Sequence, residues 1–395
     1  MDSPRVAAHR KVEMNFAIVG CGFVADLYMN ALVSHPQLKL SGVWDRDPQR
    51  LAAFTAHHNV SAYASYQALL ADASVQLVAN LTNPREHFAV SEAALLSGKH
   101  VYSEKPLATE LDRAQQLVEL AERKGLLITS APCSVLSETA QTIWKLLDDG
   151  QIGTPRLVYA ELDDGNVAAM DHASWISPSG APWPARDEFE VGCTLEHAGY
   201  HLTWLTAFFG PVQRMTSFAR VVQPDKGLPD LQPAADYATA CLAFHNGVTA
   251  RLTCSIYGSH DHRLRIFGDE GTIGIDRIWD YGAPVHLSKR HKWTHRVEKY
   301  PLFGTLTGLG PKKVPLVRKP AVSGIGLWGK NAMDFCRGIA DLAHAIDTGT
   351  QPTMTARWAL HITEVVLAMQ SPDIYGDVRD IQHQFDPLKP EQWAR

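Results

Sequence analysis

Residues 192 to 204, GCTLEHAGYHLTW, place four side chains that bind or transfer protons among apolar neighbours: Glu196, His197, Tyr200 and His201. The apolar pattern predicts a helix, and on a helix residues three and four apart are neighbours. His197, Tyr200 and His201 are therefore expected on one face. Imidazole titrates near neutral pH, so His201 is the predicted general acid–base group, with Tyr200 or His197 orienting the substrate or relaying its proton. A hydrogen-bonded structural helix is the alternative interpretation of both histidines.

Aromatic and basic side chains near this helix are predicted to bind a substrate. Trp204 lies on the same predicted helix face and offers an apolar platform for a sugar ring. The loop of residues 171–190 precedes the helix and carries Trp175, Trp183 and Arg186. Aromatic planes suit a sugar ring, and a guanidinium suits a phosphate or carboxylate. Packing that holds the loop in place is the alternative role of these residues.

A lysine in the first half of the chain is a further predicted catalytic residue. Glu104, Lys105 and Pro106 follow the apolar run HVYS, which is typical of a buried strand. At the carboxyl end of a parallel strand, a side chain lies where open α/β sheets bind ligands. The Lys105 ammonium would there hydrogen-bond a substrate hydroxyl or polarise a carbonyl that receives hydride. A surface lysine in a loop is the alternative.

The sequence GCGFVA begins at Gly20, directly after a predicted strand and before a predicted helix. It matches the G-x-G-x-x-G/A fingerprint of dinucleotide-binding sites in its required setting. Gly20 permits the tight turn, and Gly22 lets a pyrophosphate approach the backbone. The helix that starts near Phe23 and Val24 offers unpaired N–H groups to the phosphates. The fingerprint therefore predicts a dinucleotide site.

Asp45 ends the second predicted strand, twenty-five residues after Gly20. A carboxylate at this place accepts the ribose hydroxyls of the adenosine half and repels a 2′-phosphate, which favours NAD. The neighbouring Arg46 is the complication, because a guanidinium binds phosphate and would suit NADP. NAD is the predicted cofactor, and NADP is the alternative.

The elements that must position these residues alternate in the first half of the chain. Apolar runs that predict buried strands begin near residues 15, 38, 75, 100 and 126, and a helical pattern follows each of them. This alternation predicts an α/β Rossmann domain with a doubly wound parallel sheet over residues 1–150. Residues 151–395 hold strand patterns joined by hairpin turns, then two amphipathic helices. They predict an α+β domain with a large, mostly antiparallel open sheet.

Composition limits the class of protein. The 395 residues carry 37 basic and 42 acidic side chains, a balance that argues against nucleic acid as the main partner. The six cysteines include no C-x-x-C pair and no apolar run has the length of a membrane helix, so a soluble, cytoplasmic protein is expected.

His260 and His262 would share one strand face, but no cysteine or carboxylate cluster accompanies them, and no catalytic metal is predicted. The basic segment 288–320 is interpreted as a diphosphate site, a solvated excursion or an edge that meets another subunit.

Three motifs together resemble the Gfo/Idh/MocA family, named for glucose–fructose oxidoreductase and inositol dehydrogenase. They are GCGFVA, LTNPREH at residues 81–87, and the Glu-Lys-Pro at residues 104–106. The resemblance implies that Lys105 lies near the nicotinamide, aimed by a cis peptide before Pro106. It also implies a set of residues along the cofactor: Thr82, Asn83, His87, Glu104 and Lys105. A hydrogen-bonded histidine in the first turn of a helix is the alternative interpretation of His87.

The family pattern in the second domain is similar to G-x-x-x-D-x-G-x-H-x-x-D, on a helix whose aspartate and histidine face the substrate. With Gly199 as the inner glycine, His201 falls at the family histidine, His197 at the first aspartate and Trp204 at the second. The histidine is kept and both carboxylates are replaced. A register that puts Glu196 at the first aspartate breaks the glycine and histidine matches and is rejected.

The resemblance implies an NAD(P)-dependent oxidoreductase. Its expected reaction is reversible hydride transfer between nicotinamide and a secondary hydroxyl of a sugar, cyclitol or nucleotide-linked sugar. A homodimer or homotetramer is expected, as in the family. Two alternatives stay open: a redox-neutral enzyme that retains NAD and oxidises a sugar transiently to allow elimination or glycoside cleavage, and a non-catalytic sugar sensor. The intact Glu-Lys-Pro at residues 104–106 argues against the sensor.

Overall fold

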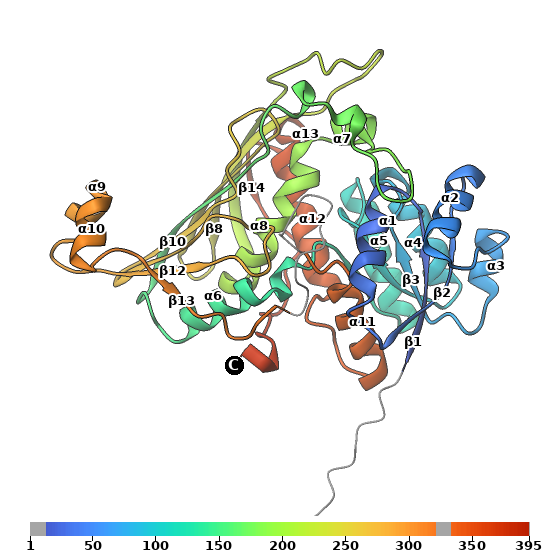
Figure 1. Ribbon diagram of the computed structural model, residues 1–395. Coiled ribbons are helices and arrows are strands. Elements are labelled where there is room, and N and C mark those ends of the chain that lie inside the picture. The colour runs from blue at the N-terminus through green and yellow to red at the C-terminus, as the bar shows by residue number, and fades with distance from the viewer. Residues whose placement is uncertain (1–12, 321–332, 395) are drawn as a thin grey trace, which may run out of the picture.

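The computed structural model describes residues 13–320 and 333–394, and its first half is a parallel sheet with helices on both faces (Figure 1). The sheet has five strands in the order β2-β1-β3-β4-β5, and every pairing is parallel. The strands are β1 (Met14–Val19), β2 (Leu38–Trp44), β3 (Leu77–Asn80), β4 (His100–Ser103) and β5 (Ile128–Ser130). They read as apolar runs because helices cover both faces. The predicted doubly wound sheet is confirmed.

The helices of the first half follow its strands: α1 (Phe23–Leu32), α2 (Pro48–His58), α3 (Tyr66–Ala71), the short η1 (Pro84–Glu86), α4 (His87–Leu96) and α5 (Leu111–Lys124). α2 begins at Pro48, because the Asp47 carboxylate accepts hydrogen bonds from two backbone N–H groups of its first turn. α3 was not predicted, since six residues are too few to show a helical period. Its one local signal is Ser65, whose hydroxyl oxygen accepts from the Ala68 N–H.

The second half forms a nine-stranded sheet in the order β13-β12-β11-β10-β6-β9-β8-β7-β14. All pairings are antiparallel except that of β6 with β9. The strands are β6 (Pro155–Asp163), β7 (Val212–Arg220), β8 (Tyr237–Phe244), β9 (Thr249–Ser255), β10 (Leu264–Gly268), β11 (Gly271–Ile275), β12 (Val285–Lys289), β13 (Lys312–Val314) and β14 (Val378–Asp380). Tight turns join β8 to β9 and β10 to β11 as hairpins. The predicted antiparallel sheet is therefore confirmed.

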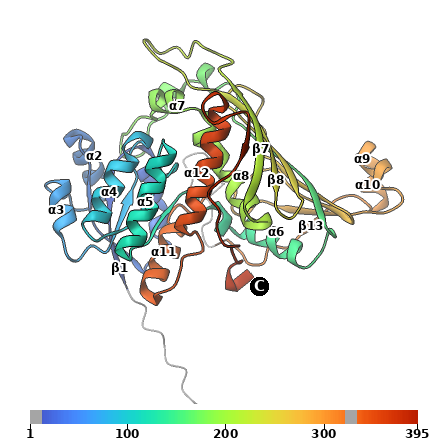
Figure 2. The ribbon, with the colours of Figure 1, turned by 180° about the vertical axis from the view of Figure 1, so that it is seen from behind.

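Two long helices pack side by side on one face of this sheet, α8 (Cys193–Phe209) and α12 (Ala356–Gln370) (Figures 1 and 2). α12 also contacts α5 of the first half, so it lies between the two sheets. Both helices are buried along nearly their whole length. The shorter helices after β5, apart from α11, are η2 (Ser134–Leu136), α6 (Glu138–Asp148), η3 (Val167–Ala169), η4 (His172–Ser174), α7 (Ala185–Val191), α9 (Thr294–Lys299), α10 (Pro301–Thr307), α13 (Pro372–Tyr375) and η5 (Gln392–Ala394).

α11 (Arg337–Thr348) is late in the sequence but packs on the first half, next to α1 in Figure 1. Ile339 and Leu342 join the hydrophobic core that contains Tyr28 and Tyr102. The Cys336 thiol, at the start of α11, donates a hydrogen bond of 3.2 Å to the Tyr28 carbonyl. The amphipathic sequence pattern that predicts this helix begins at residue 331, which lies outside the described residues. Because the chain returns to the first half, the division at residue 150 stays a prediction.

The basic segment 288–320 lies at the end of the large sheet farthest from the Rossmann half (Figure 1). It contains β13 and the two short helices α9 and α10. None of the residues that line the large cavity described below belongs to it. The diphosphate interpretation therefore finds no support in its position. Across residues 13–320 and 333–394, no helix is long and apolar enough to cross a bilayer.

Candidate active site

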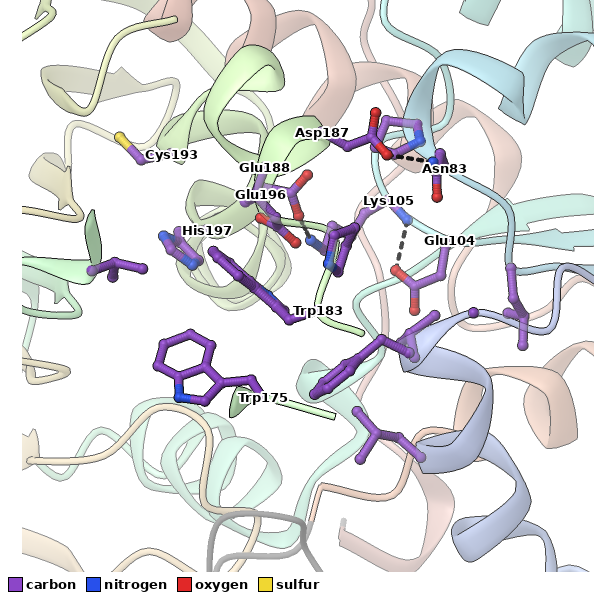
Figure 3. A pocket seen from close by; sticks show the side chains of 18 of the residues that line it. Asn83, Glu104, Lys105, Trp175, Trp183, Asp187, Glu188, Cys193, Glu196 and His197 are labelled. Atoms are coloured by element: carbon purple, nitrogen blue, oxygen red, sulfur yellow. Dashed lines mark hydrogen bonds and ion pairs between the residues drawn. The ribbon is translucent and has the colours of Figure 1, made fainter. Parts of the chain in front are cut away.

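A cavity of about 650 Å³ lies between the carboxyl ends of the Rossmann strands and the helices α7 and α8. Its Rossmann wall begins at Gly22, Phe23 and Val24, continues through Leu81 to Pro84, and ends at Glu104 and Lys105. The opposite wall is built by the loop after β6, by α7 and α8, and by Trp279. Figure 3 shows Lys105, Glu188 and Glu196 converging, with Trp175 and Trp183 entering the same space. The cavity thus joins the fingerprint to most of the other predicted site residues.

The fingerprint turn fits a dinucleotide. Gly20 has a φ of +98°, and a Cβ there would lie 2.7 Å from the backbone of Leu81, so only glycine fits. A Cβ on Gly22 would meet nothing within 4 Å, which leaves this side of the turn open towards the cavity. No side chain caps the first turn of α1, which leaves the start of this helix open to a phosphate. The expected roles of both glycines agree with this geometry.

Asp45 holds the turn from behind. Its carboxylate accepts a 2.7 Å hydrogen bond from the Cys21 N–H and a 2.8 Å bond from the Asp47 N–H. Arg46 points along the surface and forms a 2.9 Å ion pair with Glu86. A second guanidinium, that of Arg50, lines the cavity instead. The carboxylate of Asp45 is therefore fixed beside the fingerprint, as a ribose acceptor must be.

The β3 end supplies Thr82, Asn83 and His87 to the cavity wall, as predicted. Asn83 donates a hydrogen bond to Asp187 of α7, which ties the two halves together. His87 is fully buried, with Nδ1 2.6 Å from the Pro106 carbonyl and Nε2 2.8 Å from the Thr82 carbonyl. Burial is the largest influence on the pKa of His87 and lowers it, whereas the two carbonyl acceptors, which call for an N–H on each ring nitrogen, act in the opposite direction. His87 thus combines a place in the wall with the hydrogen-bonded structural role.

Lys105 is the centre of the polar contacts in the cavity. The peptide between Lys105 and Pro106 is cis, as the resemblance implied. Glu104 accepts from the Tyr28 hydroxyl at 2.7 Å and from the Lys105 N–H at 3.0 Å. The Lys105 ammonium forms an ion pair with Glu196 of α8. Burial alone would lower the pKa of Lys105, but the carboxylates around it, Glu196 first, raise it overall, so the side chain stays cationic at neutral pH.

Glu188 of α7 adds a second carboxyl group beside Glu196. Burial first, and then the charge of Glu196 and a hydrogen bond to it, raise the pKa of Glu188 well above its usual range. Two carboxylates this close do not both ionise readily, so their proximity favours the protonated form of Glu188. The cavity therefore contains a cation and two carboxyl groups.

His197 and Tyr200 line the cavity one turn apart on α8. His197 Nε2 lies 3.1 Å from the Asp164 carboxylate, and burial lowers the pKa of this histidine. Trp279 packs against both rings, with centroid distances of 5.8 Å to His197 and 5.5 Å to Tyr200. Their predicted place at the substrate is consistent with the structure.

Two predicted residues of α8 lie outside the cavity, which corrects their assignment. His201 is fully buried and faces the large sheet, with Nε2 2.9 Å from the Glu161 carbonyl. Burial lowers its pKa to about 4. Trp204 is also fully buried and donates from Nε1 to the Ser134 hydroxyl at 3.0 Å. The helix turns by about 100° per residue, so the cavity face runs through Glu196, His197 and Tyr200, and the next residue already faces away.

The loop before α8 is only partly as predicted. Trp175 and Trp183 line the cavity and pack edge to face, with ring centroids 5.0 Å apart. They therefore combine loop packing with a place in the cavity wall, and their contact with a substrate stays a prediction. Arg186 does not line the cavity: it pairs with Glu190 at 3.1 Å and donates to the Pro229 carbonyl at 2.6 Å. Its predicted role in binding a substrate is corrected, because α7 turns it to the outer surface.

Two family models match this chain. The model described as "Oxidoreductase family, NAD-binding Rossmann fold" matches residues 14–131, and the GFO/IDH/MocA C-terminal domain matches residues 140–274. The chain belongs to the Gfo/Idh/MocA oxidoreductase family. Its first domain is thus an NAD-binding Rossmann domain, in agreement with the fingerprint turn.

Relatives of this Gfo/Idh/MocA protein act on nucleotide-linked sugars by their names. It is 32% identical over 71% of its length to dTDP-3,4-didehydro-2,6-dideoxy-alpha-D-glucose 3-reductase of Streptomyces antibioticus, covering 78% of that protein. It is 26% identical over 67% of its length to UDP-N-acetylglucosamine 3-dehydrogenase of Acidithiobacillus ferrooxidans, covering 74% of it. The WlbA dehydrogenase of Bordetella pertussis, solved with NADH and UDP-GlcNAcA, shares the fold with a TM-score of 0.70 at 16% identity; the match covers 95% of this chain and 99% of that one.

Sequence reasoning missed four residues that this Gfo/Idh/MocA cavity uses: Glu188, Glu196, Asp164 and Trp279. Glu196 was rejected because motif spacing outweighed the helix geometry. A signal was present, since Glu196 and Tyr200 are four residues apart and an acid beside a predicted lysine site is a natural ion-pair partner. Asp164 and Trp279 come from loops far from α8 in sequence, and no local pattern marks them.

Proposed function

We propose that the chain catalyses reversible hydride transfer between NAD(H) and a secondary hydroxyl of a sugar, cyclitol or nucleotide-linked sugar. The observation that carries this proposal is the pairing of Lys105 with Glu196 in a cavity that begins at the fingerprint turn. The pair brings a cation from the cofactor domain and an acceptor from α8 to one place. The named activities of the two relatives above support the sugar class.

The residues that would hold the cofactor are those of the Rossmann wall. Gly20 and Gly22 receive the pyrophosphate at the start of α1, and Asp45 accepts the ribose hydroxyls. NAD, when bound, supplies the hydride acceptor, and its reduced form supplies the donor. Arg46 is engaged by Glu86 on the surface, which favours NAD over NADP.

The proton of the substrate hydroxyl is handled by groups of opposite charge. Lys105 stays a cation, so it stabilises the negative charge that develops on the reacting oxygen. Glu196 is assigned as the acceptor of the hydroxyl proton, because its carboxylate lines the cavity beside Lys105. Glu188 contacts Glu196 and extends the path by which that proton leaves. In reduction the same groups return the proton to the carbonyl oxygen.

The sugar itself would lie against the aromatic side of the cavity. Trp175, Trp183 and Trp279 present apolar ring faces there. Tyr200, His197 and Asp164 add polar groups on the same wall. A ring with hydroxyls on its edge and C–H groups on its face suits this mixture of surfaces.

The test is nicotinamide absorbance with purified protein, NAD and NADP in parallel, against free and nucleotide-linked sugars. We expect the reduced form to accumulate with at least one of these sugars. Lys105→Ala should lower kcat by roughly 10²-fold or more, the scale of electrostatic and acid–base assistance. Lys124→Ala is the matched control, because Lys124 is exposed at the end of α5. Equal turnover by Lys105→Ala and the wild type would refute the role of Lys105.

A second candidate is the redox-neutral enzyme that retains NAD. The second carboxyl group beside Lys105 favours it, since elimination or glycoside cleavage needs an acid–base group in addition to the one that takes the hydroxyl proton. The same assay distinguishes the two. A flat trace across the panel, with NAD released only on denaturation and sugar products eliminated or hydrolysed, would contradict the dehydrogenase and support this candidate.

A further inference from the structure

We propose that Asp164, His260 and His262 form a binding site for one divalent transition-metal cation of the Zn²⁺ class, beside the substrate cavity. One ligand atom from each of the three lies within 4.8 Å of the other two. Two imidazoles and one carboxylate are a donor set that zinc and its neighbours prefer, whereas Mg²⁺ and Ca²⁺ prefer oxygen ligands alone. The sequence places the two histidines on one strand face but does not reveal the third ligand, because Asp164 is almost a hundred residues away.

The backbone holds the three ligands in place. Asp163 and Asp261 form an isolated antiparallel bridge, with both N–H···O hydrogen bonds at 2.9 Å. Asp164 follows this bridge on one strand, and His260 and His262 flank it on the other. Alternation along an extended strand puts His260 and His262 on one side, and their ring centroids are 4.1 Å apart.

The distances fit an ion after small side-chain rotations. His262 Nε2 lies 2.6 Å from Asp164 Oδ1, and His260 Nδ1 lies 4.0 Å from the same oxygen. Ligand atoms bound tetrahedrally at zinc distances lie about 3.4 Å apart, which is between these two values. Three protein ligands leave one coordination position for water or another ligand, as in catalytic zinc sites.

The surroundings supply support for the ligands and a path for entry. His197 Nε2 lies 3.1 Å from the other carboxylate oxygen, Oδ2, of Asp164, the place of a supporting hydrogen bond in metal sites. Trp279 packs on His262 with centroids 4.4 Å apart and fixes its ring. The side chain of His260 is 67% exposed, so an ion reaches the site from solvent.

A second group, Asp26 with His57 and His58, has similar donor atoms but a different setting. Asp26 is fully buried, and its carboxylate oxygens already accept from His58 and from the Ser179 hydroxyl, each at 2.7 Å. Asp26 therefore links α1 to the loop before α8. Asp164 instead lines the cavity, which is why we assign the cation to its group.

The role of the cation, unlike its binding, rests on the proposed function. A cation on Asp164 would turn this part of the cavity wall from negative to positive. The wall would then attract an oxygen-rich part of the substrate, such as vicinal hydroxyls or a carboxylate. Cation binding is measured without nicotinamide or sugar, so the failure of this inference is distinguishable from failure of the proposed function.

The experiment is equilibrium dialysis of the untagged full chain against Zn²⁺, followed by metal analysis, with Co²⁺ absorption spectra as a report on imidazole ligands. We expect one ion per chain. His260→Gln should weaken binding at least about 10-fold, and His262→Gln should do the same. Loss of a residue that only supports a ligand already weakens metal binding about 10-fold or more, and loss of the ligand itself should cost at least as much. His260 is exposed, so its variant keeps the fold; the buried His262 gives the second test.

His57→Gln is the matched control, since it removes a ligand from the other group. Binding that is kept in this variant and weakened in His260→Gln supports the inference. Absence of bound metal, binding that His260→Gln leaves unchanged, or binding that only His57→Gln removes would each overturn it.

Discussion

The two walls of the cavity position their functional groups in different ways. On the Rossmann wall, Asp45, Thr82 and Lys105 each follow the end of a parallel strand, where the sheet fixes their location. On the opposite wall, Glu196 and Tyr200 lie on α8, where one residue of shift turns a side chain by about 100°. Motif spacing is therefore sufficient for the first wall. Locating the groups of the second wall also requires the rotation of α8 about its own axis. The apolar pattern does not determine this rotation, because the helix is buried nearly all round.

The largest expected effect on kcat distinguishes Glu196 from His201, the acid–base residue that the motif predicts. Glu196→Gln should lower kcat by roughly 10²-fold, because the cavity loses the acceptor that faces Lys105. His201→Gln should change kcat by less than about 3-fold and leave the pH profile of kcat in place, since His201 faces the sheet. Steady-state kinetics of both variants across pH measure this.

The opposite result would support the motif alignment, which assigns His201 to the substrate. A flattened pH profile in His201→Gln, with Glu196→Gln close to the wild type, would mean that α8 turns its other face to the substrate during turnover. Circular dichroism of both variants controls for loss of folded protein.

A second expected effect concerns stability in acid. Burial lowers the pKa of His201 to about 4, below the value of about 6.5 in an unfolded chain. The unfolded state therefore binds the extra proton first, and the contribution of the neutral ring is complete above pH 6.5 and is lost as the pH falls towards 4. His201→Gln should reduce the drop in the free energy of unfolding between pH 7 and 4.5 by about 2 to 3 kcal/mol. Urea titrations at the two pH values measure it, and an unchanged drop would show that His201 is not a buried neutral ring.

The smallest expected effect compares two neighbours on the Rossmann wall. Asp45→Asn should weaken NAD binding about 10-fold or more. The substitution removes the negative charge that accepts hydrogen bonds from the ribose hydroxyls and from the Cys21 N–H. Arg46→Ala should change NAD affinity by less than about 3-fold, since its pair with Glu86 is exposed. Fluorescence titration with NAD and NADP checks both. Tight NADP binding that Arg46→Ala abolishes would reverse the assignment of the cofactor.

Most of the fold could be predicted from the sequence because its signals are local. The strands of the Rossmann half are apolar runs with a turn residue at the end, and Asp47 with Pro48 marks the start of α2. The first wall of the site follows from the same local signals, through Gly20 and Lys105. Glu188 and Trp279 could not be predicted, because the first lies on a seven-residue helix and the second on a loop. Their place depends on tertiary packing between distant segments.

The return of α11 to the first half sets an order for assembly of the chain. The core around Tyr28 and Tyr102 is closed by Cys336, Ile339 and Leu342, more than 200 residues later. During synthesis, the nucleotide-binding half emerges from the ribosome long before the helix that completes it. Until then its aromatic surface is open to water, and its last contacts have high contact order. The C-terminal segment thus acts as the closing step for the N-terminal core, and a chain truncated before residue 334 lacks that closure.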